Sequence, residues 1–261
     1  MKRFILSHKS DFDFILDNTL KASDYTILSP TNCMGIAHHV RIVNPNGQYE
    51  SVEHWTDSER IPVKVIDGIT NPKYGEVTAW NYILSQLRDG EYGSLCHYRR
   101  EMINVPDGHV CVARPIYLNC TVEKHTAYYH SSMMMALLKR FLHKEDYKYL
   151  SESNMFFPYN IFSAPKQVIG EWCWWQNFFI KKMEEITGPD IEHFLRKNYG
   201  EQGGDTFTPR PGKNISVSYQ SRFYAFISER LNTVFWRRKM KENKFKIAFQ
   251  NVRLMEEGQK I

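Results

Sequence analysis

Residues 92–100 read YGSLCHYRR, a short apolar run that ends in concentrated positive charge. The run predicts a buried strand, and the basic cluster that follows it consists of His97, Tyr98, Arg99 and Arg100. In open α/β sheets, ligands bind beyond the carboxyl ends of the strands, where two guanidinium groups and an imidazole can neutralise a diphosphate. The stretch therefore predicts an anion site for a phosphorylated donor. The alternative is that Tyr98 packs while both arginines are solvated or paired with carboxylates.

Strands and helices alternate on both sides of this stretch. Apolar runs predict strands at 4–6, 25–28 and 110–113, and helical spacing predicts helices at 75–87, 132–142 and 221–241. A further helix before Gly188 carries one apolar stripe, made of Trp172, Trp175, Phe179, Met183 and Ile186. The alternation predicts an α/β fold with a largely parallel central sheet flanked by helices. We expect one domain over residues 1–241 and a basic C-terminal tail over 242–261.

Two segments lack this periodicity, and we expect loops there. The segment from the turn at 44–47 to Asn71 and Pro72 is polar and irregular, which predicts a loop on the substrate side. The segment 200–212 contains paired glycines and two prolines. It predicts a flexible loop of the kind that can cover an active site.

Composition limits the class of protein. The 261 residues are 42% hydrophobic and 14% aromatic, which is enough for the core of one large globular domain. The net charge of +5 is too small to indicate nucleic acid as a partner, and it suits anionic substrates or an anionic membrane surface. Five dispersed cysteines without a C-x-x-C pair indicate neither a disulfide framework nor a zinc site. With no signal peptide or bilayer-spanning run recognised, we expect a cytoplasmic protein, with peripheral contact at the inner face of the cell membrane left open.

Two carboxylates are candidate proton acceptors. Glu229 lies in the last predicted helix, on a polar face that it shares with Arg222 and Asn232. In a cleft, this carboxylate could deprotonate an acceptor hydroxyl, as an inverting group transfer requires, and bulk solvent is the alternative environment. Glu76 begins an earlier helix, where it either complements the helix dipole or orients an arginine of the basic cluster.

The residues after the first strand are candidate phosphate and metal ligands. His8 and Lys9 follow its carboxyl end, where they either reach a phosphate or lie in a solvated loop. Asp11 and Asp13 form the only D-x-D pair, but this position favours Asp11 as a helix N-cap. A divalent ion, Mn²⁺ or Mg²⁺, stays open as a cofactor, and we assign no metal ligand.

The end of the last predicted helix is basic and aromatic. Residues 236–241 read WRRKMK, and Lys244 and Lys246 follow. This composition fits an anionic lipid surface, and a solvated helix end is the alternative. No other feature indicates nucleic acid, and we expect none as a partner.

Several of these motifs together resemble a family of bacterial glycosyltransferases, first described as a domain of unknown function, from capsule, exopolysaccharide and O-antigen gene clusters. Residues 74–79 (YGEVTA) look like the family's Y-C-E-L-T-A, and 93–100 look like its G-L-x-H-Y-R-R. Farther along, YNIF at 159–162, Lys166 and EWCWW at 171–175 are similar to N-M-F…K…E-Y-C-x-W, and SERLN at 228–232 is similar to S/A-E-R-L-x-N. The resemblance covers about residues 3 to 236.

The resemblance implies a GT-A-like nucleotide-sugar-binding domain and hexosyl transfer, with a UDP-linked donor and galactofuranose or galactose as candidate sugars. On this interpretation, His8, Lys9 and the basic cluster bind the donor diphosphate. Glu229 is the first candidate base and Glu76 the second. Asn160, Arg222 and Arg230 are expected on the acceptor side of the cleft, which would take a saccharide or a lipid-linked acceptor.

The chain departs from the family pattern at two points. Glu101 and Met102 stand where an aromatic pair is usual, and residues 81–84 replace a Y-W-x-W motif. These changes leave the donor and acceptor preference open. Two rival functions also stay open: a transferase that uses another anionic donor, and a non-catalytic carbohydrate-binding or assembly protein of a polysaccharide locus.

Overall fold

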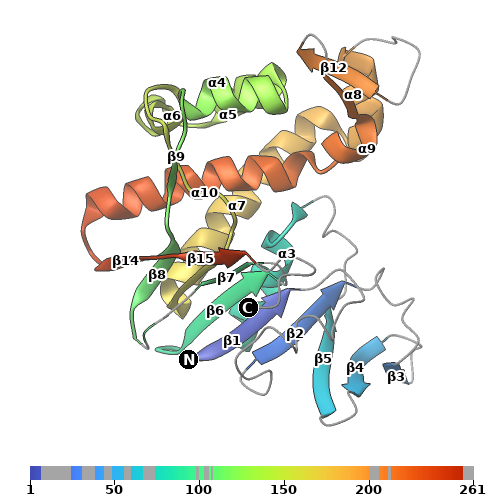
Figure 1. Ribbon diagram of the computed structural model, residues 1–261, viewed down its shortest axis with the longest axis vertical. Coiled ribbons are helices and arrows are strands. Elements are labelled where there is room, and N and C mark those ends of the chain that lie inside the picture. Colours follow the sequence, from blue (N-terminus) through green and yellow to red (C-terminus); the bar gives the residue numbers. More distant parts are fainter. Residues whose placement is uncertain are drawn as a thin grey trace.

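The computed structural model describes residues 1–6, 25–30, 39–43, 49–55, 60–66, 74–97, 100–102, 106, 108–199, 206–210 and 213–254. Figure 1 shows these residues as a twisted sheet in the lower half of the molecule, with long helices above it. No helix among them is both long and apolar enough to span a bilayer.

Four parallel strands form the centre of the sheet. In spatial order they are β6 (Tyr92–His97), β1 (Lys2–Leu6), β2 (Tyr25–Pro30) and β5 (Arg60–Ile66). Leu6 and His97 are paired at the carboxyl ends of β1 and β6. The predicted α/β fold with a parallel centre is confirmed, and the basic cluster begins at the edge where parallel strands end.

Antiparallel pairings extend the sheet on both sides, so that it is mixed rather than largely parallel. Beyond β6 lie β11 (Phe162–Pro165), β8 (Val110–Ala113) and β14 (Ile247–Gln250), and beyond β5 lie β4 (Tyr49–Trp55) and β3 (His39–Val43). β11 runs against β6 and β8, and β4 runs against β5 and β3. The sequence predicts a loop over 44–72, and this prediction is wrong where β4 and β5 lie. In β5, the apolar residues Ile61, Val63 and Val65 alternate with other residues, as in a strand, although the surrounding segment is polar.

The last two strands of the chain, β14 and β15 (Val252–Leu254), belong to the sheet. β7 (Arg100–Met102) turns back beside β6, with Arg100 opposite His97, and β15 pairs with β7. β14 lies parallel to β8. The sequence predicts a basic tail over 242–261, which contains β14 and β15, because the strands that pair with them are far away in sequence and leave no local signal.

Three helices build the core above the sheet. They are α3 (Val77–Gln86), α7 (Lys166–Thr187) and α10 (Phe223–Glu242), of which α3 and α7 contact the sheet and α10 packs on α7. Trp80 of α3 stacks on Phe162 of β11 with 3.8 Å between ring centroids. Ile186, predicted on the apolar stripe of α7, is 38% exposed. In the last turn of the helix, the buried face that contains Met183 continues at Thr187, four residues later, rather than at Ile186.

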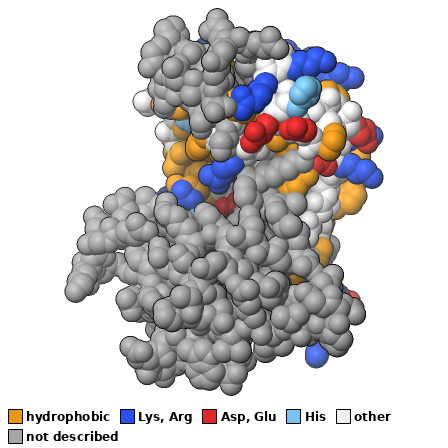
Figure 2. All heavy atoms as spheres, turned by 90° about the vertical axis from the view of Figure 1, so that its right-hand side faces the viewer, with side chains coloured by type: hydrophobic (Ala, Val, Ile, Leu, Met, Phe, Trp, Pro, Cys, Tyr) orange, Lys and Arg blue, Asp and Glu red, His pale blue; other side chains and the backbone are white. Residues whose placement is uncertain are grey.

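The remaining elements lie around α10. They are β9 (Ile116–Tyr117), α4 (Val122–Tyr129), α5 (Ser132–Phe141), α6 (Lys144–Ser151), β10 (Met155–Phe156), α8 (Ile191–Tyr199), β12 (Thr206–Arg210), β13 (Lys213–Ser216) and α9 (Val217–Gln220). The hairpin of β12 and β13 lies partly in the segment 200–212, for which the sequence predicted a flexible loop. Figure 2 shows basic and acidic side chains interspersed over the described part of the helical layer.

Candidate active site

The structure describes most, but not all, of the residues that the sequence indicated. His8, Lys9, Asp11, Asp13, Tyr98 and Arg99 lie outside the described residues. The described candidates are His97, Arg100, Glu76, Glu229, Asn160, Arg222 and Arg230.

Glu76 is held close to α10 by the glycine that precedes it. Gly75 has a φ of +60°, a conformation that side chains rarely adopt, and a Cβ there would lie 3.1 Å from the Cβ of Ala225. Beside it, Tyr74 stacks on Tyr224 of α10 with 5.5 Å between ring centroids. The close backbone approach brings the start of α3 against the helix that carries Glu229.

Replacing Gly75 with Ala is expected to lower the free energy of unfolding by about 1–3 kcal/mol. Two costs contribute: an alanine at this positive φ is strained, and its Cβ would lie too close to Ala225. Gly90→Ala is the matched control: its φ is +80°, but nothing lies within 4 Å of the added Cβ. Urea unfolding followed by circular dichroism measures both variants. A loss in Gly75→Ala no larger than that in Gly90→Ala would contradict the close approach.

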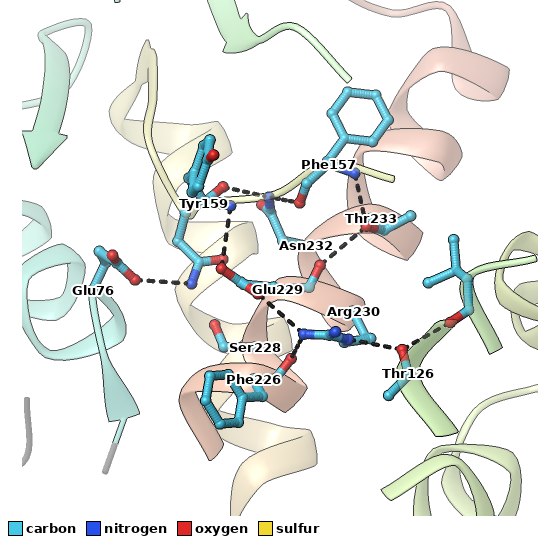
Figure 3. A network of polar contacts seen from close by, with 12 residues as sticks. Glu76, Thr126, Phe157, Tyr159, Phe226, Ser228, Glu229, Arg230, Asn232 and Thr233 are labelled. Atoms are coloured by element: carbon cyan, nitrogen blue, oxygen red, sulfur yellow. Dashed lines mark hydrogen bonds and ion pairs between the residues drawn. The ribbon is translucent and has the colours of Figure 1, made fainter. Parts of the chain in front are cut away.

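The loop between β10 and β11, residues 157–161, contacts both carboxylates. Tyr159 has a φ of +63°, and its backbone N–H donates to Oε1 of Glu229 at 3.4 Å. The next residue, Asn160, is fully buried and donates from Nδ2 to Oε2 of Glu76 at 3.2 Å. Figure 3 shows both contacts on one side of α10. Glu76 and Glu229 therefore face one site, each held by one of two consecutive residues.

The loop is itself fixed from two sides. Trp80 donates from its indole nitrogen to the carbonyl oxygen of Asn160 at 2.6 Å. Asn232 of α10 donates from Nδ2 to the carbonyl oxygen of Tyr159 at 3.0 Å. These buried bonds tie the loop to α3 and α10, so the geometry of the carboxylates is set by the core.

Glu229 is a partly buried carboxylate next to a buried cation. Its side chain is 26% exposed, and Oε2 lies 3.0 Å from Nη1 of Arg230. Burial raises the pKa of Glu229 and the nearby charge of Glu76 adds to this effect, while Arg230, the Tyr159 N–H and Arg100 oppose it. A carboxylate with a raised pKa in a partly open position can accept a proton from a bound hydroxyl.

Arg230 lies behind Glu229 rather than in the open part of the site. It is 1% exposed, and its guanidinium donates from Nε to Thr126 at 3.0 Å and from Nη1 to the carbonyl oxygen of Phe226 at 2.9 Å. The resemblance to the glycosyltransferase family predicts Arg230 beside an acceptor. Most residues in the first four turns of α10 are buried, and Arg230 among them is closed off from solvent. Its guanidinium therefore cannot reach an acceptor, and it pairs with Glu229 from inside the protein.

A buried histidine lies close to Arg230. His130 is 8% exposed and its ring packs on Phe226 at 4.1 Å between centroids. Burial, together with the Arg230 cation, lowers the pKa of His130 to about 2. The folded protein therefore keeps this imidazole neutral at pH values where the unfolded chain, with an ordinary pKa of about 6.5, binds a proton.

This difference predicts loss of stability in acid. The stabilisation by His130 is complete above the unfolded pKa, and it declines by about 1.4 kcal/mol per pH unit below about pH 6.5, as pH falls toward the folded value. Urea unfolding between pH 7 and pH 5 measures this slope. His130→Gln is expected to reduce it, and His193→Gln, at an exposed position, is the control for replacing a histidine elsewhere. Equal slopes in wild type and His130→Gln would refute the prediction.

Arg100 brings positive charge to the same site. Its guanidinium carbon lies 4.1 Å from the ring centroid of Tyr159, and its charge opposes the raised pKa of Glu229. Tyr159 also packs against the small cluster of Met102, Ala113 and Ile161, together with Val252 of β15. The pairing of β7 with β6 thus places Arg100 above Tyr159, near enough to Glu229 for its charge to act on that carboxyl.

Comparison with solved structures adds to this geometry. The fold resembles that of a glycosyltransferase. The apo structure of WbbM, a bifunctional glycosyltransferase, matches 98% of this chain with a TM-score of 0.61 at 12% sequence identity. The chain corresponds to 45% of the WbbM chain. No family model and no curated protein matches the sequence.

Not every sequence candidate lies at the centre of this glycosyltransferase-like fold. Arg222 is the exposed N-cap of α10, with its guanidinium carbon 5.7 Å from the ring centroid of Phe226. It makes no described contact with the two carboxylates. Within the described ranges, no group of three or more His, Cys, Asp or Glu residues could hold a metal ion.

The basic end of α10 is engaged within the protein. Arg238 lies 3.5 Å from Asp146, and Lys239 pairs with Glu171 and Glu242. Trp236, part of the same sequence run, is 1% exposed. These contacts use side chains that the sequence analysis considered for a lipid surface.

Sequence reasoning missed the residues that connect the site. Tyr159 appeared only as part of a motif, because nothing local predicts a left-handed tyrosine. Thr126 and Trp80 were assigned no role. One feature of the sequence could have indicated the loop contact. Asn232 is a polar residue in a long helix rich in aromatic residues, and a buried polar side chain there needs a hydrogen-bond partner, which is the carbonyl oxygen of Tyr159.

Proposed function

We propose that this chain is a glycosyltransferase that moves a hexosyl unit from a nucleotide sugar to a saccharide or lipid-linked acceptor. One observation carries the proposal: Arg100 and the carboxylates of Glu76 and Glu229 converge near the carboxyl end of β6. This edge is where open α/β sheets bind ligands. The similarity of fold to WbbM supports a transferase, and the sequence motifs favour UDP-linked galactofuranose or galactose in capsule, exopolysaccharide or O-antigen synthesis.

In this proposal, cationic side chains hold the donor diphosphate. Arg100 and His97 would act with Tyr98, Arg99, His8 and Lys9, which follow the ends of β6 and β1 in sequence. The Nε of Arg100 is buried and lacks a hydrogen-bond partner among the described residues, so a ligand oxygen would satisfy it. As the bond between the anomeric carbon and the diphosphate breaks, these charges would stabilise the departing nucleotide.

Glu229 would be the base of an inverting transfer. The acceptor hydroxyl would give its proton to Glu229 while its oxygen forms the new bond to the anomeric carbon. Glu76, held by Asn160, is the second candidate and otherwise orients the acceptor or Arg100. Because Asn160 is fully buried, its part in this proposal is to hold Glu76 in place rather than to contact the acceptor.

A thermal-shift panel tests the proposal. Nucleoside diphosphates and nucleotide sugars, each with and without Mn²⁺, are added to the wild-type protein, since a ligand that binds only the native state raises the melting temperature. UDP or a UDP-sugar is expected to stabilise the protein, and the Mn²⁺ arm decides whether a metal takes part. No response to any nucleotide would favour a non-catalytic carbohydrate-binding protein.

A further inference from the structure

A second concave site lies between α7 and α10. Its volume is about 380 Å³, within the range of roughly 300–1,000 Å³ that small-molecule sites occupy. Trp174, Trp175 and Phe235 supply its apolar walls, and Glu171, Lys239 and Glu242 supply charged groups. The pocket therefore combines aromatic surface with several polar groups, as ligand sites do.

This pocket is separate from the candidate active site. Lys239 and Glu242 lie in the last turns of α10, roughly 15–20 Å along the helix from Glu229 at 1.5 Å per residue. Arg238, nine residues after Glu229, is on the opposite side of the helix at 3.6 residues per turn. A molecule in the pocket is therefore out of reach of the reacting atoms.

The aromatic wall of the pocket is open to solvent. Trp174 is 63% exposed, and it stacks on Phe178, itself 43% exposed, with 5.4 Å between ring centroids and 18° between ring planes. The two ring planes are nearly parallel, so the contact with Phe178 supports the indole of Trp174 at the surface. The negative π-face of an indole attracts weakly positive C–H groups, such as those on one face of a pyranose ring.

The charged groups are balanced and already ordered. Nζ of Lys239, a side chain that is only 11% exposed, lies 2.9 Å from Oε2 of Glu242 and also pairs with Glu171. Arg238 stacks over Trp175, 4.9 Å from its ring centroid. Two carboxylates beside two cations disfavour a polyanion or an anionic lipid, because neither sign dominates. They offer both donors and acceptors, which suits a neutral ligand rich in hydroxyl groups.

We propose that this pocket binds neutral hexose units of a saccharide chain, at a distance from the end of the chain that reacts. The proposal rests on the proposed function, since a polysaccharide acceptor supplies such units. A chain held at a second point increases the effective concentration of its free end at the active site. Trp174 would provide the stacking surface, and Glu171 and Glu242 would accept hydrogen bonds from sugar hydroxyls.

Saturation-transfer difference NMR tests this site without any need for activity. The probes are linear tetrasaccharides of glucose, galactose and mannose, added to the wild-type protein and to Trp174→Ala. At least one probe is expected to bind the wild type, and Trp174→Ala is expected to weaken that binding about tenfold or more. Glu242→Gln should weaken it less. Tyr117→Ala, which removes a ring that is 66% exposed on β9, is the matched control and should bind as the wild type does.

The test separates this site from the active site. UDP-induced thermal stabilisation should be the same in Trp174→Ala as in the wild type, so loss of saccharide binding with intact nucleotide binding supports a second site. Saccharide binding without any nucleotide response would support the pocket and count against the transferase. Binding of none of the probes, or equal binding by Trp174→Ala, would overturn the proposal. So would Trp174-dependent binding to phosphatidylglycerol vesicles in place of the sugars.

Discussion

Glu229→Gln is expected to reduce the rate of glycosyl transfer about 10²–10⁴-fold, the usual contribution of a positioned general base. The amide is nearly isosteric, and its single carbonyl oxygen can still accept one of the two hydrogen bonds, from Arg230 or from the Tyr159 N–H, so the site should keep its overall shape. It cannot accept the proton of the acceptor hydroxyl. Rates with donor and acceptor at saturation measure kcat, and circular dichroism checks the fold.

Glu76→Gln is the matched control for this variant. Both carboxylates face the same site, but among the described contacts it is Glu229 that is paired with a buried cation, Arg230. We expect a smaller loss in Glu76→Gln. A larger loss in Glu76→Gln than in Glu229→Gln would exchange the roles of the two residues.

The pH profile adds a second readout for Glu229. Because burial raises its pKa, kcat should increase with pH as the carboxyl loses its proton, at pH values above the usual titration range of a glutamate. The residual activity of Glu229→Gln should lack this rise. The same rise in both proteins would assign the titration to another group.

Arg100→Ala is expected to weaken nucleoside diphosphate binding by about 2–5 kcal/mol, which is at least about 30-fold in Kd. The variant removes the guanidinium above Tyr159 that, in this account, contacts the diphosphate. Arg100→Lys keeps the charge but loses the planar stacking group, so an intermediate Kd is expected. Titration calorimetry with UDP measures all three proteins.

Arg140→Ala serves as the control for a general loss of positive charge. Arg140 is an exposed residue near the end of α5, and it makes no described contact with the site. Its Kd for UDP should equal that of the wild type. An Arg100→Ala protein that is folded and binds UDP as tightly as the wild type would remove Arg100 from the donor site.

The sequence predicted the parts of the molecule whose signals are local. The apolar run that ends at His97 predicted the end of β6, and helical spacing predicted α3, α5 and α10 to within a few residues. Glu76 and Glu229 were both indicated as candidates, although only the fold shows that one loop contacts both.

The parts that sequence reasoning missed depend on long-range contacts. β14 and β15 gain their strand structure by pairing with β8 and β7, which no local pattern of the C-terminal segment reveals. Arg230 looked like a cleft residue, because a helical period cannot show that α4 covers that side of α10. The positive φ of Tyr159 likewise follows from its contacts with Asn232 and Glu229 rather than from its side chain.

The most direct test of the account is release of nucleotide from sugar donors. UDP-, GDP- and CDP-linked hexoses are incubated with the wild-type protein, Glu229→Gln and Arg100→Ala, with a panel of saccharide acceptors, and free nucleotide is measured together with the glycosylated product. We predict acceptor-dependent release of one nucleotide by the wild type and strong loss in both variants. Saccharide binding without release of any nucleotide, or release that is unchanged in both variants, would contradict the assignment of this site as a glycosyltransferase centre.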